Sequence, residues 1–338
     1  MREKLLSELD SSQSLPLPHS THTIASSPAA RRYWFILNPA ANRGKAKKKV
    51  TPLQQTLKAK QVDTTIQLTT QPNEATDFAR AVKSSVDIVV ACGGDGTFNE
   101  TAQPLIHSKT VLGCIPIGSG NDFYSNLSGH TAPRKIPLET AVEKVLNTAT
   151  CTIDTGTVHF EQNGLHVERA FLNSLGIGFT GEIARIAKQV PHVRGDLIYL
   201  YALWIVGRTY RAAPMTIELH TPSGVQTITE SVFALMIGNG KREGGKFWIT
   251  PEAEMSDGWL DICILKEFPM WKLPRWVFAF MRGSHIHTSQ VIYTKISRAI
   301  IHLSRPESMH LDGEVYEQVG PSVQVSVVPQ SLRVVAIS

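Results

Sequence analysis

Residues 87–100, with the sequence DIVVACGGDGTFNE, hold an apolar run that ends at two glycines, and an aspartate follows between glycines. Glycine has no Cβ, so this backbone can adopt positive φ and bring its amide N–H groups close to a ligand. A helix that begins near Thr97 adds unpaired N–H donors and the positive end of its dipole. These features predict an anion site. Asp95 fits such a site if Mg²⁺ accompanies a phosphate or if its carboxylate handles a proton.

The same residues also fit an ordinary tight turn in which Asp95 caps a helix. A second loop of the same kind argues against that alternative, because residues 113–124, GCIPIGSGNDFY, again run from an apolar strand into a glycine-rich turn. A third polar strand end lies at residues 38–44. In a doubly wound sheet the loops at the carboxyl ends of neighbouring strands line one crevice, so we expect these loops to meet.

The length of 338 residues is comfortable for two domains. Residues 1–30 are rich in Ser, Thr, His and Pro without the apolar core of a signal peptide, so we expect a disordered extension. Apolar strands then alternate with helices, which predicts a doubly wound α/β domain over residues 31–155 around a parallel sheet. The expected strands are 32–39, 63–70 and 86–94, and the expected helices are 45–62 and 73–85.

Short β-rich segments separated by Gly, Pro and Asn predict a mainly antiparallel β domain over residues 156–321. Helical stretches interrupt it near 181–190, 196–211 and 270–283. The tail, about residues 322–338, is expected to form two more strands and to complete the α/β domain.

The net charge is +5 and the pI is near 9.0, which favours acidic partners such as phosphates or an anionic membrane surface. Four widely spaced cysteines predict buried thiols in a reducing cytoplasm, with neither zinc nor disulfides. The longest uncharged apolar stretch, residues 197–207, is about half of a bilayer span and predicts a buried helix. The sequence has no P-loop, no protein-kinase signature and no aromatic-basic platform for nucleic acid.

Taken together, the loops resemble the lipid kinases of the diacylglycerol kinase catalytic-domain type, which include bacterial diacylglycerol kinases, related soluble lipid kinases and sphingosine kinases. The resemblance spans about residues 31–338. The matching segments are NPAANRG (38–44), Thr69 ahead of NEA, GGDGTFNE (93–100), PIGSGNDF (116–123), FLNSLGIGF (171–179), TPEAEMSDGWLD (250–261) and LDGE (311–314).

The resemblance implies a nucleotide domain similar to those of NAD kinase and phosphofructokinase, a C-terminal antiparallel β-sandwich, and a site between them. It implies transfer of phosphate from ATP, with Mg²⁺, to a lipid hydroxyl, most simply that of diacylglycerol. Ser119 stands where most members of the family have Thr, and it keeps the hydroxyl. The residues expected to bind the nucleotide are Asn38, Pro39, Ala40, Ala41, Asn42, Thr69, Gly93, Gly94, Asp95, Gly96, Thr97, Phe98, Asn99, Ser119, Asn121 and Asp122.

The same resemblance assigns the catalytic base to Glu314, with Asp312 beside it, and leaves the separate roles of Asp95 and Asp122 open. It implies a second, structural Mg²⁺ held by Asp257 and by backbone oxygens of Glu254 and Trp259. An Asp-Gly pair is also an ordinary hairpin turn, so each of these assignments competes with a purely structural interpretation. The implied protein is a cytoplasmic enzyme in peripheral contact with an anionic membrane. No nucleic-acid partner is expected, and a homodimer is left open.

Two alternative functions stay beside this hypothesis, and one segment has two interpretations. The chain could be a lipid- or nucleotide-binding regulator of the same fold without turnover. Residues 176–181, GIGFTG, match a dinucleotide-binding turn and allow an NAD(P)-dependent oxidoreductase. Residues 270–283 mix Trp271 and Trp276 with basic side chains, so they fit either contact with lipid headgroups or packing against the β domain.

Overall fold

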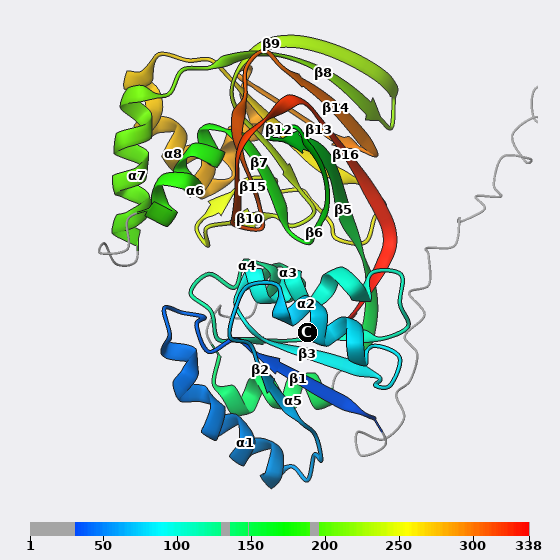
Figure 1. Cartoon of the computed structure of the whole chain (residues 1–338). Helices are drawn as coiled ribbons and strands as arrows, with labels where there is room; N and C mark the ends of the chain where they lie inside the picture. Colours follow the sequence, from blue (N-terminus) through cyan, green and yellow to red (C-terminus); the bar gives the residue numbers. More distant parts are fainter. Residues whose placement is uncertain (1–30, 130–135, 148, 190–195, 338) are drawn as a thin grey trace, which may run out of the picture.

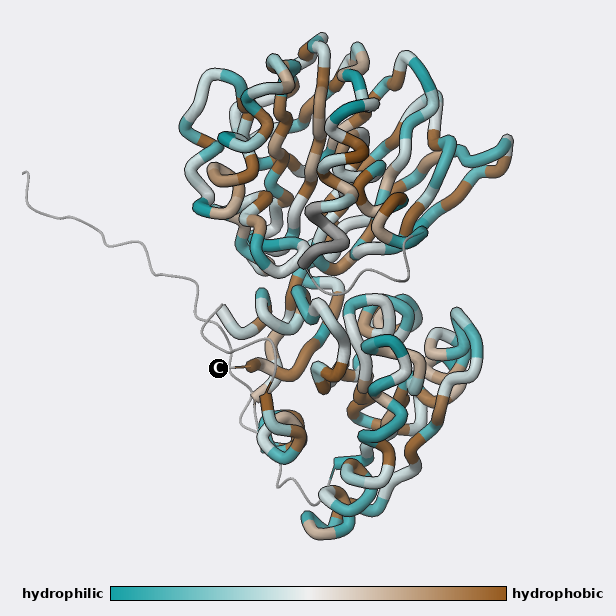
Figure 2. Tube along the Cα trace, turned by 90° about the vertical axis from the view of Figure 1, so that its left-hand side faces the viewer, coloured by the Kyte–Doolittle hydropathy of each residue, from teal (hydrophilic) through white to brown (hydrophobic). Residues whose placement is uncertain are grey.

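The computed structural model describes residues 31–129, 136–147, 149–189 and 196–337. Figure 1 shows two parts, a smaller α/β part and a larger β-rich part, and strands β5 and β16 run between them. Figure 2 shows the two parts from another side, with hydrophobic residues along the strands of both. The expected extension at residues 1–30 lies outside the described residues.

The α/β part is built on a parallel sheet with the order β2-β1-β3-β4. Alternate residues of β3 face opposite sides, so Val89 packs in one core cluster with α2 and α3, and Val90 packs in another with α1 and α5. The predicted parallel sheet with helices on both faces is therefore confirmed. Its elements are β1 (Tyr33–Leu37), η2 (Lys45–Lys49), α1 (Val50–Ala59), β2 (Ile66–Leu68), α2 (Glu74–Val82), β3 (Ile88–Gly93), α3 (Asp95–Ala102), η3 (Gln103–Leu105), β4 (Val111–Pro116), α4 (Asp122–Leu127) and α5 (Leu138–Asn147).

The β-rich part is an antiparallel β-sandwich domain. Its pairings include a closed circuit, β7-β9-β8-β14-β16-β15, whose inward side chains form one large apolar cluster. The elements are β5 (Thr150–Gln162), β6 (Leu165–Phe171), β7 (Ser174–Gly178), α6 (Phe179–Gln189), α7 (Asp196–Thr209), β8 (Ala213–Thr221), β9 (Gly224–Gly238), β10 (Arg242–Glu243), β11 (Phe247–Trp248), β12 (Leu260–Lys266), η4 (Met270–Lys272), α8 (Leu273–Arg282), η5 (Ser284–His287), β13 (Val291–Ile296), β14 (Arg298–Leu303), β15 (Glu307–Leu311) and β16 (Glu314–Val335).

The prediction of two strands in the tail is wrong, because β16 is one strand of 22 residues. A register shift against β5 between Val328 and Leu332 carries the strand past Pro329, which has no N–H to donate. Beyond the shift, Val334 pairs in parallel with Leu112 of β4. The last strand therefore pairs with strands of both domains and joins them into one hydrogen-bonded sheet. The residue boundaries between the domains stay a prediction.

Two predictions of burial also need correction. Helix α7 buries Ala202 and Val206, but Tyr201 and Trp204 are 43% and 56% exposed, because only one side of the helix packs on the sandwich. Cys151 is exposed, since β5 begins at the surface, whereas the other three cysteines are buried. Within the described residues, no helix is long and apolar enough to cross a membrane.

The dinucleotide turn at residues 176–181 is excluded by the sheet. Strand β7 pairs antiparallel with both β9 and β15, whereas a Rossmann turn follows a strand of a parallel βαβ unit. Its glycines serve packing, because a Cβ on Gly181 would lie 2.1 Å from the carbonyl oxygen of Ser308.

Candidate active site

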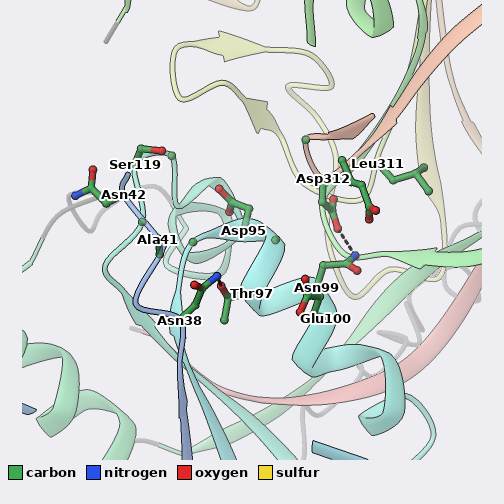
Figure 3. A pocket seen from close by; sticks show the side chains of 16 residues that line it. Asn38, Ala41, Asn42, Asp95, Thr97, Asn99, Glu100, Ser119, Leu311 and Asp312 are labelled. Atoms are coloured by element: carbon green, nitrogen blue, oxygen red, sulfur yellow. Dashed lines mark hydrogen bonds between the residues drawn. The ribbon is translucent and has the colours of Figure 1, made fainter. Parts of the chain in front are cut away.

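A cavity of about 410 Å³ lies between the two domains, at the carboxyl ends of β1, β3 and β4 (Figure 3). The three loops expected to meet do line one crevice. The β15–β16 turn of the sandwich domain closes its other side. The lining residues are Asn38, Ala41, Asn42, Gly94, Asp95, Gly96, Thr97, Asn99, Glu100, Gly118, Ser119, Gly120, Leu311, Asp312, Gly313 and Glu314.

The loops are fastened to one another by short contacts. The Nδ2 of Asn38 donates to Thr97 Oγ1 at 3.2 Å, which joins the first loop to the second. The second and third loops approach most closely at two glycines, because a Cβ on Gly118 would lie 2.3 Å from the Cα of Gly94. Any larger residue at position 118 would force these strand ends apart.

Several residues expected to bind nucleotide do not line the cavity: Pro39, Ala40, Thr69, Gly93, Phe98, Asn121 and Asp122. Thr69 is buried, and Phe98 is in the core, where its ring lies 6.2 Å from that of Phe123. Asn121 is also buried, and its Oδ1 accepts the N–H of Gly118 at 3.1 Å. These buried side chains support the loops and do not face the cavity.

Asp95 caps a helix, but not the one that it begins. Its Oδ1 accepts the N–H of Phe123 at 2.9 Å, so the carboxylate caps α4, the helix that follows the third loop. Burial raises the pKa of the Asp95 carboxyl, and the amides at the start of α4 oppose that shift. Asp95 therefore ties two loops together and lines the cavity as well.

The turn between β15 and β16 is a two-residue hairpin. Leu311 pairs with Glu314, and the residues between them have positive φ, 48° at Asp312 and 87° at Gly313. This is the backbone that an Asp-Gly hairpin requires. The structural interpretation of this dipeptide is therefore correct, and the same turn also lines the cavity.

The Asp312 carboxylate accepts four N–H donors. Oδ1 accepts from the backbone of Asn173 and Ser174, both at 2.9 Å, and Oδ2 accepts from the backbone of Leu172 and from Asn99 Nδ2, both at 2.7 Å. Burial raises the pKa of the Asp312 carboxyl, and these donors act in the opposite direction. Since Asn99 belongs to α3, Asp312 also bonds the two domains across the cavity (Figure 3).

Glu314 has different surroundings. It is exposed at the start of β16 and lines the cavity from the sandwich side. Facing it is Glu100, a lining residue that the sequence interpretation missed although the GGDGTFNE segment contains it. The pKa of the Glu100 carboxyl is raised by burial and by the charge of Glu314, and amides near the start of α2 oppose the shift.

A buried polar group behind the turn also escaped the sequence interpretation. Ser174 Oγ donates to Glu243 Oε2 at 3.2 Å, and Glu243 Oε1 lies 3.1 Å from His310 Nε2. Burial raises the pKa of Glu243 to about 7 and lowers that of His310 to about 4, so it favours the neutral form of each. No local pattern marks these residues, because they come from β7, β10 and β15 and meet only in the fold.

The expected structural metal site lies elsewhere, since Glu254, Asp257 and Trp259 are not among the cavity residues. Asp257 Oδ2 forms an ion pair with Lys295 Nζ, and Oδ1 accepts the N–H of Trp259 at 3.0 Å. Across the described part of the chain, no group of three His, Cys, Asp or Glu side chains is placed to hold a metal. Lys295 pairs with the one side chain of the expected set, and the backbone oxygens of Glu254 and Trp259 were its other members, so the structural metal site stays a prediction.

Comparison with known proteins identifies the architecture. Residues 32–158 match a family model described as the diacylglycerol kinase catalytic domain, and residues 173–336 match the YegS C-terminal NAD kinase β-sandwich-like domain. A diacylglycerol kinase of Bacillus subtilis is 28% identical over 287 residues, 84% of this chain and 90% of that protein. One of Mycobacterium tuberculosis is 28% identical over 301 residues, 88% of this chain and 93% of that protein.

A crystal structure of a diacylglycerol kinase from Bacillus anthracis has the same fold, with a TM-score of 0.66 and 21% identity, over 90% of this chain and 97% of that one. The two matched domains, with the cavity between them, define a two-domain lipid kinase. The chain belongs to the diacylglycerol kinase catalytic-domain family.

Proposed function

We propose that this lipid kinase transfers the γ-phosphate of ATP to the hydroxyl of diacylglycerol and so forms phosphatidic acid. The observation that carries the proposal is the cavity, where glycine loops of one domain face Glu314 of the other. Two relatives that match most of the chain are named diacylglycerol kinase, which supports this acceptor. The enzyme would act in the cytoplasm in peripheral contact with the membrane, and a homodimer remains compatible with this function.

The α/β domain would bind the nucleotide. Gly94, Gly96 and Gly118 line the cavity and let a ligand approach the backbone, and α3 begins there with the positive end of its dipole. Phosphoryl transfer depends mainly on positioning and on neutralising charge. Asp95 and Glu100 put carboxylates in the same cavity, which suits a Mg²⁺ ion carried by the phosphates. Such an ion would offset part of the phosphate charge.

In the proposed step, the lipid hydroxyl oxygen bonds to the γ-phosphorus, the bond from that phosphorus to the β–γ bridging oxygen breaks, and ADP leaves. Glu314 accepts the hydroxyl proton, because it is the exposed carboxylate of the turn. Asp312 serves differently, since four N–H donors already occupy its oxygens. It holds the turn, and thereby Glu314, against α3.

The test incubates the protein with γ-labelled ATP, Mg²⁺ and mixed micelles that each contain one lipid alcohol, and then follows labelled lipid. We expect transfer to diacylglycerol. Glu314→Gln should lower kcat about 100-fold or more, the usual contribution of a positioned base. Glu317→Gln, an exposed glutamate of the same strand, is the matched control and should keep full turnover. Normal turnover of Glu314→Gln would remove this residue from the mechanism. A folded protein that labels no lipid would favour the regulator alternative.

A further inference from the structure

Exposed large apolar side chains are concentrated on three neighbouring elements. Eight such residues are exposed in the described part of the chain, and five of them lie on α7, η4 and α8. Trp271 is 78% exposed and Phe278 is 61% exposed, which are high values for aromatic side chains. The five residues are Tyr201, Trp204, Trp271, Phe278 and Met281.

Close packing anchors the inner side of this group. A Cβ on Gly207 of α7 would lie 2.8 Å from the Cδ2 of Leu273 and 3.7 Å from the Cε of Met270, so α7 contacts both η4 and α8 directly. Val206 and Trp276 belong to the same buried cluster. Figure 1 shows α7 and α8 together at one end of the sandwich domain. The exposed residues therefore lie on elements whose inner sides pack against one another.

The aromatic segment at residues 270–283 was expected either to pack against the β domain or to contact lipid headgroups, and in the structure its residues fall into two groups. Trp276 is 8% exposed and packs against Phe268, as the packing interpretation requires. Arg275, Phe278 and Arg282 are exposed, and their spacing of three or four residues places them along one stripe of α8. Trp271, in the preceding η4, is exposed as well. One side of α8 is core, and the other is apolar and basic.

Positive charge accompanies the exposed rings. The Arg208 guanidinium lies 4.7 Å from the ring centre of Trp204, and Lys272 Nζ lies 5.2 Å from that of Trp271. The sequence has no Asp or Glu between Glu267 and Glu307. Exposed aromatic rings beside basic side chains are typical of helices that lie in the interface of an anionic bilayer.

We propose that this aromatic-basic face, made of the five exposed apolar residues with Arg208, Lys272, Arg275 and Arg282, docks the enzyme on an anionic lipid bilayer. The inference rests on the proposed function in one respect, since a bilayer is where a lipid alcohol would be found. The proposal adds where the enzyme contacts the bilayer and by which groups. The aromatic rings enter the headgroup layer, and the arginine and lysine side chains bind lipid phosphates. The docking needs no turnover, so it is measured separately from phosphate transfer.

The test measures sedimentation of the full chain with vesicles of phosphatidylcholine alone or with about a third of phosphatidylglycerol. We expect binding to the anionic vesicles only, and weaker binding at 0.5 M salt, as the electrostatic contribution is screened. Trp271→Ala with Phe278→Ala should weaken vesicle binding about tenfold or more. The matched control is Leu165→Ala with Val225→Ala, which trims exposed apolar side chains from strands β6 and β9 and should leave binding unchanged.

Phosphate transfer to a short-chain, water-soluble diacylglycerol should be unchanged in the Trp271 and Phe278 variant, because neither residue lines the cavity. That result would also show that the variant is folded. The proposal is overturned if the wild-type chain ignores anionic vesicles or if this variant binds them as well as the wild type does. It is likewise overturned if light scattering shows that the substitutions dissociate a dimer while vesicle binding persists, since a second copy would then cover this face.

Discussion

Two Asp-Gly turns of this molecule have the same residues, but the aspartates differ in backbone conformation and in surroundings, since Asp312 has positive φ and Asp257 does not. Gly313 and Gly258 both have positive φ, 87° and 79°, and a Cβ on either would meet open space. At the first turn, the Asp312 carboxylate is held by four N–H donors drawn from both domains. At the second, the Asp257 carboxylate is paired with the ammonium of Lys295.

The difference teaches that an Asp-Gly dipeptide specifies a turn, while its neighbours decide what the carboxylate does. The four N–H dipoles around Asp312 stabilise the negative charge of its carboxylate at the domain boundary. No positively charged side chain has to enter the cavity for this. A lysine beside Asp257 neutralises it and leaves little for a cation to bind.

The largest effect is expected at the first turn, from Asp312→Asn. Each oxygen of Asp312 accepts two donors, so an NH₂ group in place of either oxygen leaves two N–H groups without a partner. The free energy of unfolding should therefore fall by about 3 kcal/mol. Transfer of phosphate should fall about 100-fold, because a misplaced turn misplaces Glu314. Urea unfolding and the mixed-micelle assay measure the two effects. Asp257→Asn is the matched control, and equal losses in both variants would refute the contrast.

A pH-dependent effect comes next, from Asp261, four residues beyond Asp257. It is fully buried, Tyr293 donates to its Oδ1 at 2.7 Å, and its Oδ2 has no hydrogen-bond partner among the described residues. Burial raises the pKa of Asp261 from 3.8 to about 6. The folded state therefore binds this proton more tightly than the unfolded state does. Stability from this group is present below about pH 4 and is lost as the pH rises through about 6.

Asp261→Asn should remove that dependence. The shift corresponds to about 3 kcal/mol, so the variant should gain up to this amount relative to the wild type between pH 4 and 7. Thermal unfolding of the wild type and the variant followed across this range measures the gain. Parallel pH profiles for the wild type and Asp261→Asn would show that Asp261 stays ionised when folded.

A smaller effect is expected from two matched substitutions, Gly313→Ala and Gly258→Ala. Alanine at positive φ costs about 1 kcal/mol, and with no contact near either position the two losses of stability should be similar. Only Gly313→Ala should also lower kcat, because only that glycine lines the cavity. Melting temperatures and initial rates on one batch of each variant make the comparison. If both variants lose turnover equally, the first turn has no special part in catalysis.

The sequence predicted the parallel sheet and its three loops because those signals are local: apolar runs that end in glycine and polar residues. It missed the group of Ser174, Glu243 and His310, since strands distant in sequence bring these side chains together. It also missed the exposed side of α7, because an apolar run does not reveal which of its faces has a partner. The continuity of β16 past Pro329 depends on a register shift that only the pairing with β5 defines.

The smallest effect is expected from the ion pair at the second turn. The side chains of Lys295 and Asp257 are 34% and 19% exposed, so solvent screens their attraction. A double-mutant cycle with Lys295→Met and Asp257→Asn should give a coupling of about 0.5–1 kcal/mol. Activity should not change, since neither residue lines the cavity.

The same variants test the predicted structural Mg²⁺. With Lys295 paired to Asp257, we expect neither EDTA nor millimolar Mg²⁺ to shift the melting temperature of the wild type. Lys295→Met frees the carboxylate, and Mg²⁺ should then raise the melting temperature of that variant, because a ligand that binds only the folded state stabilises it. The double variant lacks both groups and should not respond. A melting temperature of the wild type that falls in EDTA would show that the metal, and not the lysine, neutralises this turn.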